Sequence, residues 1–247
     1  MNTPMPKAGL QWIQQGFQTF KKHPFELLFM FFGLIFFNLG LSLIPYLGSF
    51  LPFVFGPVLG MGIMHACRDI DQAKPIATGS LLIVFRSPAF KPLLVLGCLY
   101  TMALVGSLAC SIPVDDGALW NYLTDPSKAD QKALVKSNIG WGMLTFFVVY
   151  TPAAMGFWFG APLIMWHGMG VAKAIFYSFF AVWRARRAFM VYLLAWCGIL
   201  SFVALLVALS GGVLGVLMLP VMLTISLVMY CTFYFSYTAV FSRDQLV

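Results

Sequence analysis

The chain has 247 residues, of which 61% are hydrophobic and only 9% are charged, with a formal net charge of +7. Soluble domains carry about 25% charged residues, so this composition excludes a soluble globular protein and indicates an integral membrane protein. The basic residues flank apolar segments and no nucleic-acid-binding module is present, so we expect no nucleic-acid partner.

Six apolar segments are long enough to cross a bilayer, which takes about 20 helical residues. They cover approximately residues 24–44, 46–66, 90–112, 140–166, 188–209 and 213–241. In hydrocarbon an open strand would leave backbone groups unpaired, and the sequence lacks the short alternating segments of a barrel. The prediction is therefore an all-α polytopic membrane protein that forms one domain over residues 1–247.

The basic residues predict how these spans are oriented. All of them except Lys128, Lys132 and Lys136 lie before the first span, between spans two and three, between spans four and five, or after the sixth. The positive-inside rule places that side in the cytoplasm. We therefore expect both termini to be cytoplasmic.

Several of these basic residues are candidates for binding an anionic lipid headgroup or a partner protein. The densest group lies in "FAVWRARRAF", residues 180–189. A cation at an anionic membrane surface contributes about 1 kcal/mol to binding. The candidates are Arg184, Arg186, Arg187, Arg86, Lys91, Lys21 and Lys22. The same charges also anchor the topology, and the sequence leaves both roles open.

A threefold pattern recurs along the chain. Residues 80–98 and 178–197 share a Val-aromatic-Arg motif, and residues 16–32 contain a fainter copy. We predict three pseudo-repeated units, each with a short interfacial helix on the cytoplasmic face, a basic patch and a helical hairpin. The units would cover about residues 8–70, 76–168 and 171–244, and their short helices about residues 8–20, 78–85 and 171–183.

Small residues and prolines mark the second helix of each predicted hairpin. GxxxG spacing lets helix backbones approach closely, and an internal proline kinks a helix. The predicted helix-packing glycines are Gly56, Gly60, Gly156, Gly160, Gly211 and Gly215. The prolines in the same spans are Pro57, Pro162 and Pro220.

Groups suited to catalysis or metal binding are scarce. The centres of the six spans lack Asp, Glu, Lys and Arg, which counts against an ion-coupled transporter. No Ser or Cys has a base beside it, and no CxxC motif occurs. His65 and His167 are weak candidates for a metal or haem site, because no HExxH motif and no orienting carboxylate accompany them. We expect no enzymatic activity, no cofactor and no disulfide.

Three segments carry a family resemblance: "AAMGFWFGAPLIMWHG" (153–168), "FYSFFAVWRARRAFMVYLLAW" (176–196) and "YCTFYFSYTAVFSRD" (230–244). With these the chain resembles an uncharacterised family of six-span bacterial inner-membrane proteins. It is more distantly similar to the membrane domains that accompany some glycerophosphodiester phosphodiesterases. The resemblance implies a six-span protein in the bacterial inner membrane and supplies no established activity.

Three functions stay open at this point. The favoured one is a non-enzymatic accessory, scaffold or assembly subunit of a membrane complex, with a membrane-protein partner or a homo-oligomer. The second is a protein that binds lipids or amphiphiles through its cytoplasmic basic patches and Gly- and Pro-broken spans. The third is a transporter or channel for a small solute, in which broken helices bind the ligand through their backbone.

Overall fold

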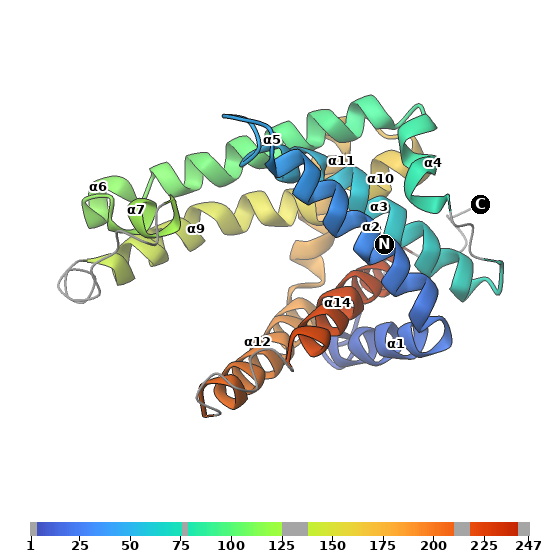
Figure 1. Cartoon of the computed structure of the whole chain (residues 1–247). Helices are drawn as coiled ribbons and strands as arrows, with labels where there is room; N and C mark the ends of the chain where they lie inside the picture. The colour runs from blue at the N-terminus through green and yellow to red at the C-terminus, as the bar shows by residue number, and fades with distance from the viewer. Residues whose placement is uncertain (1–3, 76–78, 125–137, 210–217, 242–247) are drawn as a thin grey trace.

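The computed structural model describes residues 4–75, 79–124, 138–209 and 218–241, and all regular structure in these ranges is helical (Figure 1). Six helical segments there are long and apolar enough to cross a membrane, which confirms the predicted all-α, six-span fold. The spans are α2 (Pro24–Ser42), α3 (Leu51–Asp71), α5 with α6 (Phe90–Ala109, Ile112–Asp115), α9 with α10 (Ile139–Trp158, Gly160–His167), α12 (Arg186–Leu209) and α14 (Leu219–Val240).

Three short helices precede the hairpins, close to the predicted positions. They are α1 (Ala8–Lys22), α4 (Ser80–Arg86) and α11 (Val171–Arg184). A further short helix, α7 (Ala118–Thr124), follows α6. Figure 1 shows α1 and α4 at one end of the molecule, here called the basic end, and α6 and α7 at the opposite end.

The second span begins at Leu51, later than the predicted residue 46. The residue before a proline disfavours helical geometry, so Ile44 and Pro45 separate α2 from α3. A tight turn follows, in which Tyr46 has a φ of 64° and Gly48 N donates to the Ile44 carbonyl at 2.8 Å. The apolar run continues through this turn, and for that reason hydropathy alone placed the boundary too early.

Each short helix packs on a hairpin other than the one into which it leads. Helix α1 packs on α14 and α12, α4 packs on α3, and α11 packs on α9 and α10. A cyclic threefold repeat would produce this pattern of contacts. The repeat itself stays a prediction.

Helix α1 is embedded in the protein through one face. Trp12 is 1% exposed and its ring lies 5.3 Å from that of Phe189 on α12. A Cβ atom on Gly16 would lie 2.9 Å from the backbone nitrogen of Thr232 on α14, and one on Gly9 would lie 2.8 Å from the backbone nitrogen of Tyr192 on α12. These two glycines therefore let α1 approach both helices of the last hairpin.

The fourth span is broken at Phe159, between α9 and α10. Pro162, from which we predicted a kink, has no N–H to donate to the Trp158 carbonyl. At the break, the Ser178 hydroxyl of α11 accepts a hydrogen bond from the Phe159 N–H at 2.8 Å and donates one to the Met155 carbonyl at 2.8 Å. A side chain inserted into the helical hydrogen-bond ladder in this way produces a bend.

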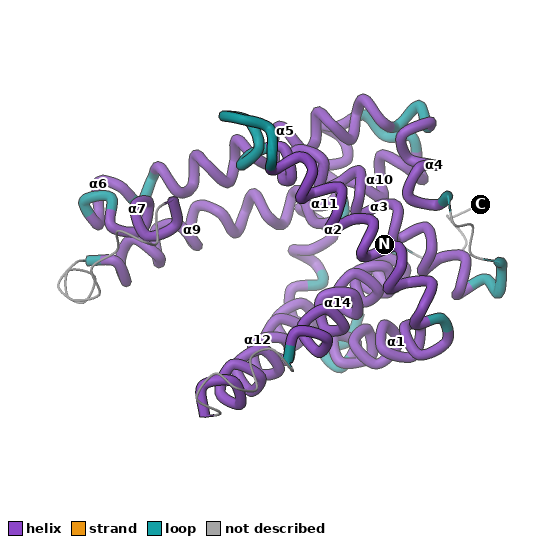
Figure 2. The backbone as a smooth tube through the Cα atoms, in the orientation of Figure 1, coloured by secondary structure: helices purple, strands orange, loops and turns teal. Residues whose placement is uncertain are grey.

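The long helices form two arms that diverge away from the basic end. In Figure 2, α5 runs beside α9 in one arm, α12 and α14 form the other, and the arms separate toward the left of the view. Helix α3 packs on α5 and on α14. The arms therefore meet at α3, where a cavity of about 650 Å³ lies.

Candidate functional site

A cavity of about 650 Å³ lies where α3, α5, α9, α10, α12 and α14 meet. Small-molecule sites in proteins have volumes of about 300–1,000 Å³ and mostly apolar walls. The described residues that line this cavity include no Asp, Glu, Lys, Arg or His. Phe53 and Met229 belong to the wall and are 42% and 38% exposed, so the cavity is open to its surroundings. Its chemistry suits a neutral, mainly apolar ligand.

The polar atoms of the cavity wall are mainly hydroxyl groups. The Tyr100 and Tyr150 hydroxyls lie 2.9 Å apart and link α5 to α9. Ser226 of α14 donates to the Met222 carbonyl one turn earlier at 2.9 Å. Hydroxyl groups can exchange such bonds for bonds to a ligand oxygen. The wall can therefore orient a small polar group on an otherwise apolar molecule.

The α3 wall owes its openness to the first GxxxG pair. A Cβ atom on Gly56 would meet no atom within 4 Å, and one on Gly60 would lie 3.6 Å from Tyr230, an ordinary contact. Both glycines line the cavity. Gly56 therefore faces open space in this structure, and its predicted role in helix packing stays a prediction.

The second pair lies in a more crowded environment. A Cβ atom on Gly156 would lie 2.9 Å from the Ile175 side chain of α11, and one on Gly160 would lie 3.2 Å from the Leu96 side chain of α5. Gly211 and Gly215 lie outside the described residues. The glycines of closest backbone approach include Gly9 and Gly16, which the search for GxxxG spacing missed because they are seven residues apart on α1.

Aromatic and polar side chains pack together where α3, α10 and α14 end at the basic end. This basic-end cluster consists of His65, Arg68, Asp71, Trp166, His167, Tyr234 and Tyr237. The Arg68 guanidinium lies 5.4 Å from the centre of the Trp166 ring, and Trp166 lies 5.1 Å from the Tyr237 ring. Tyr234 donates to an Asp71 carboxylate oxygen at 3.1 Å. The cluster begins at His65, directly after Met64, which is the last residue of α3 that lines the cavity.

The two histidines of the cluster make different contacts. His167 Nε2 lies 2.8 Å from the Tyr237 hydroxyl, whereas His65 packs edge-on against Trp166 with ring centres 5.7 Å apart. His65 Nε2 is buried without a hydrogen-bond partner. In the described part of the chain, no three His, Cys, Asp or Glu residues are grouped to hold a metal ion.

Two buried cysteines lie close together at the same depth, a feature that the sequence analysis missed. The Sγ atoms of Cys67 on α3 and Cys231 on α14 are 3.3 Å apart. Both residues are fully buried and reduced. They are 164 residues apart in the chain, so only the packing of α3 on α14 brings them together.

The seven basic candidates lie on the surface, near the ends of the three short helices or at the starts of the spans that follow them. Lys21 and Lys22 end α1, Arg86 ends α4 and Arg184 ends α11, while Lys91 and the pair Arg186 and Arg187 begin α5 and α12. All seven are exposed. A cation in the last turn of a helix is favourable because the helix dipole is negative there.

Aromatic rings support two of these cations. Lys21 Nζ lies 4.7 Å from the centre of the Phe17 ring, and the Arg186 guanidinium lies 5.4 Å from that of Trp183. In the part of the chain that the structure describes, none of the seven candidates pairs with an acidic side chain. Their charges are therefore available to anionic groups outside the protein.

Comparison with known proteins places the chain in a family. No family model matches it, and no solved structure does. A protein of Burkholderia thailandensis named "Probable inner membrane protein" is 32% identical over 250 residues, which cover 97% of this chain and 93% of the relative. The chain belongs to that family. The family is one of inner-membrane proteins, and six described helical segments of this chain are long and apolar enough to span the membrane. The placement of both termini in the cytoplasm stays a prediction, and so does the similarity to phosphodiesterase-associated membrane domains.

Proposed function

We propose that this protein is a non-enzymatic inner-membrane protein that binds a neutral amphiphile or lipid in the cavity between its two arms. The observation that carries the proposal is the volume of about 650 Å³ with an uncharged, mainly apolar wall. Hydroxyl groups from Tyr100, Tyr150 and Ser226 supply the few polar contacts that fix a ligand's orientation.

The shape of the cavity supports entry from the bilayer or from the end opposite the basic end. Toward the basic end, the wall ends at Met64 and is followed by the Arg68, Trp166 and Tyr237 contacts of the basic-end cluster. A solute channel would need a path through this packed cluster. For this reason we favour ligand binding over the alternative of a transporter or channel.

A cavity-filling substitution tests the proposal. Gly56→Trp introduces a large ring at a residue that lines the cavity, where no atom lies within 4 Å of the Cβ position. Gly106→Trp is the matched control, since Gly106 on α5 has equally open surroundings, is exposed and does not line the cavity. Native mass spectrometry of protein extracted gently from its own membrane measures the bound mass.

We expect one neutral ligand of defined mass on the unmodified protein and on Gly106→Trp, and its loss from Gly56→Trp. Ligand retained by Gly56→Trp, or no ligand on any of the three proteins, would overturn the proposal. Melting temperatures of the ligand-free samples show whether each variant is folded.

An accessory or scaffold subunit is the second candidate, and the surface of α2 favours it. Phe25, Phe29 and Phe36 are 82%, 68% and 67% exposed, and with Phe32 they follow one side of the helix at helical spacing. Such a row can pack against a partner helix or a second copy within the bilayer. Replacing the four phenylalanines with leucine and measuring the mass of the extracted complex tests this candidate.

A further inference from the structure

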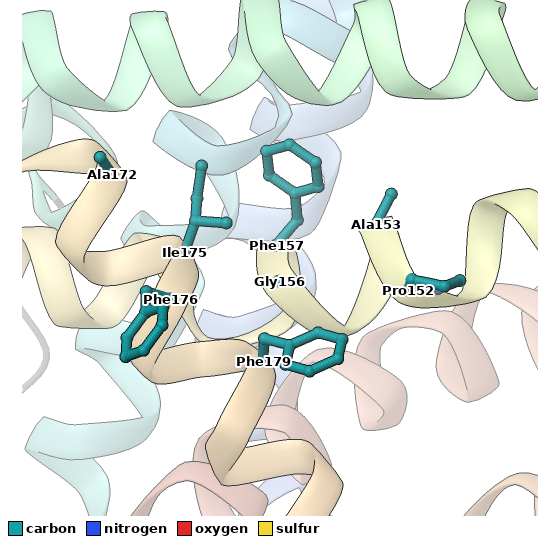
Figure 3. Close-up of a pocket in the computed structure, with 8 residues that line it drawn as sticks. All are labelled: Pro152, Ala153, Gly156, Phe157, Ala172, Ile175, Phe176 and Phe179. Carbon is teal, nitrogen blue, oxygen red and sulfur yellow. The ribbon is translucent and has the colours of Figure 1, made fainter.

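A second apolar hollow, separate from the cavity, lies between α9 and α11. This groove has a volume of about 470 Å³ and is lined by four residues of α9, from Pro152 to Phe157, and four of α11, from Ala172 to Phe179. Figure 3 shows these side chains around the crossing of the two helices. None of the eight residues is charged or has a polar side chain.

The groove is held in shape by the contact of α11 with the break in the fourth span. Ser178 of α11 makes hydrogen bonds of 2.8 Å to the Phe159 N–H and to the Met155 carbonyl, which ties α11 to the end of α9. On the floor of the groove, the absence of a side chain at Gly156 lets Ile175 approach the backbone of α9. The groove is therefore a feature of the folded protein that does not depend on an occupant.

The exposed surface of α11 has the character of a helix at a membrane boundary. Phe176, Phe180 and Trp183 are 61%, 45% and 51% exposed and form one aromatic face. Lys173 and Arg184 are exposed on the adjacent side of the helix. Helices with this division lie in the interface plane, with rings toward the acyl chains and cations toward the phosphates.

Lys173 directly follows Ala172, which lines one end of the groove, and its side chain is exposed beside it on α11. Its Nζ atom lies 5.8 Å from the centre of the Tyr177 ring. Within the described residues Lys173 forms no ion pair, and neither does Arg184. The first turn of α11 therefore carries both the end of an apolar groove and a positive charge without a counter-ion among the described residues.

We propose that this groove binds an acyl chain of an anionic phospholipid whose phosphate group is bound by Lys173. The occupant matches both parts of the site, since the groove takes hydrocarbon and the lysine takes the negative headgroup. With the basic end in the cytoplasm, the lipid belongs to the cytoplasmic leaflet. The site differs from the cavity in position, in the charge of its ligand and in the helices that form it.

Selectivity for an anionic headgroup distinguishes this site from ordinary contact with surrounding lipid. The test uses the full chain in nanodiscs that contain equal amounts of phosphatidylglycerol and phosphatidylcholine. Native mass spectrometry counts the lipids retained after the disc is removed. The variants are Lys173→Gln, which removes the charge, and Ala153→Trp, which fills the groove.

Each variant has a control at a site away from the groove. Lys74→Gln removes an exposed lysine after α3, and Ala109→Trp adds a ring to an exposed position of α5. We expect one retained phosphatidylglycerol on the unmodified protein and both controls, and roughly fivefold weaker binding of it by Lys173→Gln. Ala153→Trp should lose the retained lipid entirely.

Two results would overturn the inference: equal retention of the two lipids by the unmodified protein, or equal phosphatidylglycerol occupancy on Lys173→Gln and Lys74→Gln. If Ala153→Trp fails to fold, the surface variant Lys173→Gln still decides the question. Gly56→Trp should keep its phosphatidylglycerol, so failure of the cavity proposal and failure of this one give different patterns.

Discussion

Ser178 donates a hydrogen bond to the Met155 carbonyl across the interface between α11 and α9, at 2.8 Å. Because Ser178 also accepts from the Phe159 N–H, one hydroxyl replaces a direct backbone bond in a membrane-spanning helix. Backbone groups within a bilayer must find partners inside the protein. This contact therefore joins the short helix to the kink of the fourth span.

Removing this hydroxyl should destabilise the protein. Ser178→Ala leaves a buried carbonyl and a buried N–H without their partner, at a cost of about 1–3 kcal/mol. We expect a lower melting temperature in detergent for Ser178→Ala than for Ser201→Ala, which changes an exposed serine of α12. Equal melting temperatures would mean that the backbone re-forms its own hydrogen bond.

Alanine substitutions of glycine should have opposite signs at Gly16 and Gly40. At Gly16 a methyl group meets the Thr232 backbone, and overpacking of this kind costs about 1–3 kcal/mol. At Gly40 no atom lies within 4 Å, so alanine should stabilise α2 by up to about 1 kcal/mol through its helix propensity. Thermal unfolding in detergent measures both, and the same sign for both would contradict the packing of α1 on α14.

The buried thiols should form a crosslink on oxidation. The Sγ atoms of Cys67 and Cys231 are 3.3 Å apart, and a disulfide needs about 2.05 Å, so a small shift suffices. Treatment with diamide, followed by alkylation and mass spectrometry, should show one intramolecular disulfide that joins α3 to α14. Cys231→Ala should abolish it. Alkylation of both thiols after prolonged oxidation would argue against this helix contact.

Neutralising the three arginines together should reduce binding of anionic lipid. At about 1 kcal/mol for each charge, the change of Arg184, Arg186 and Arg187 to glutamine lowers affinity on the order of 100-fold. Titration with phosphatidylglycerol vesicles measures the affinity. Neutralising Lys128, Lys132 and Lys136 is the control, and it should leave binding nearly unchanged. Equal affinities for the two variants would assign the arginines to topology alone.

Local patterns were sufficient to predict the helices. Long apolar runs predict the six spans. The periodicity of polar and aromatic residues before Pro24 and Arg186 predicts α1 and α11. Both signals can be read from the sequence because each depends only on residues that are close together in the chain. The basic residues predicted to lie at the ends of helices are found there, and their side chains are exposed. The predicted orientation of the protein in the membrane, with both termini in the cytoplasm, depends on these same charges and stays a prediction.

The candidate site could not be predicted in this way. Gly56 and Gly16 both lie inside helices, yet Gly56 faces a cavity and Gly16 touches the Thr232 backbone. Which of these applies depends on the helices that become neighbours, and a spacing motif carries no information about its partner. The Cys67–Cys231 and His167–Tyr237 contacts were missed for the same reason.

The sequence by itself determined the membrane class, the number of spans and the three short helices, because the cost of burying polar groups in hydrocarbon acts on each segment separately. Only the tertiary structure decided that α1 packs on the last hairpin and that Ser178 bridges the break at Phe159. The cavity and the α9–α11 groove arise in the same way. They are volumes left between helices, and such volumes exist only once distant segments have packed.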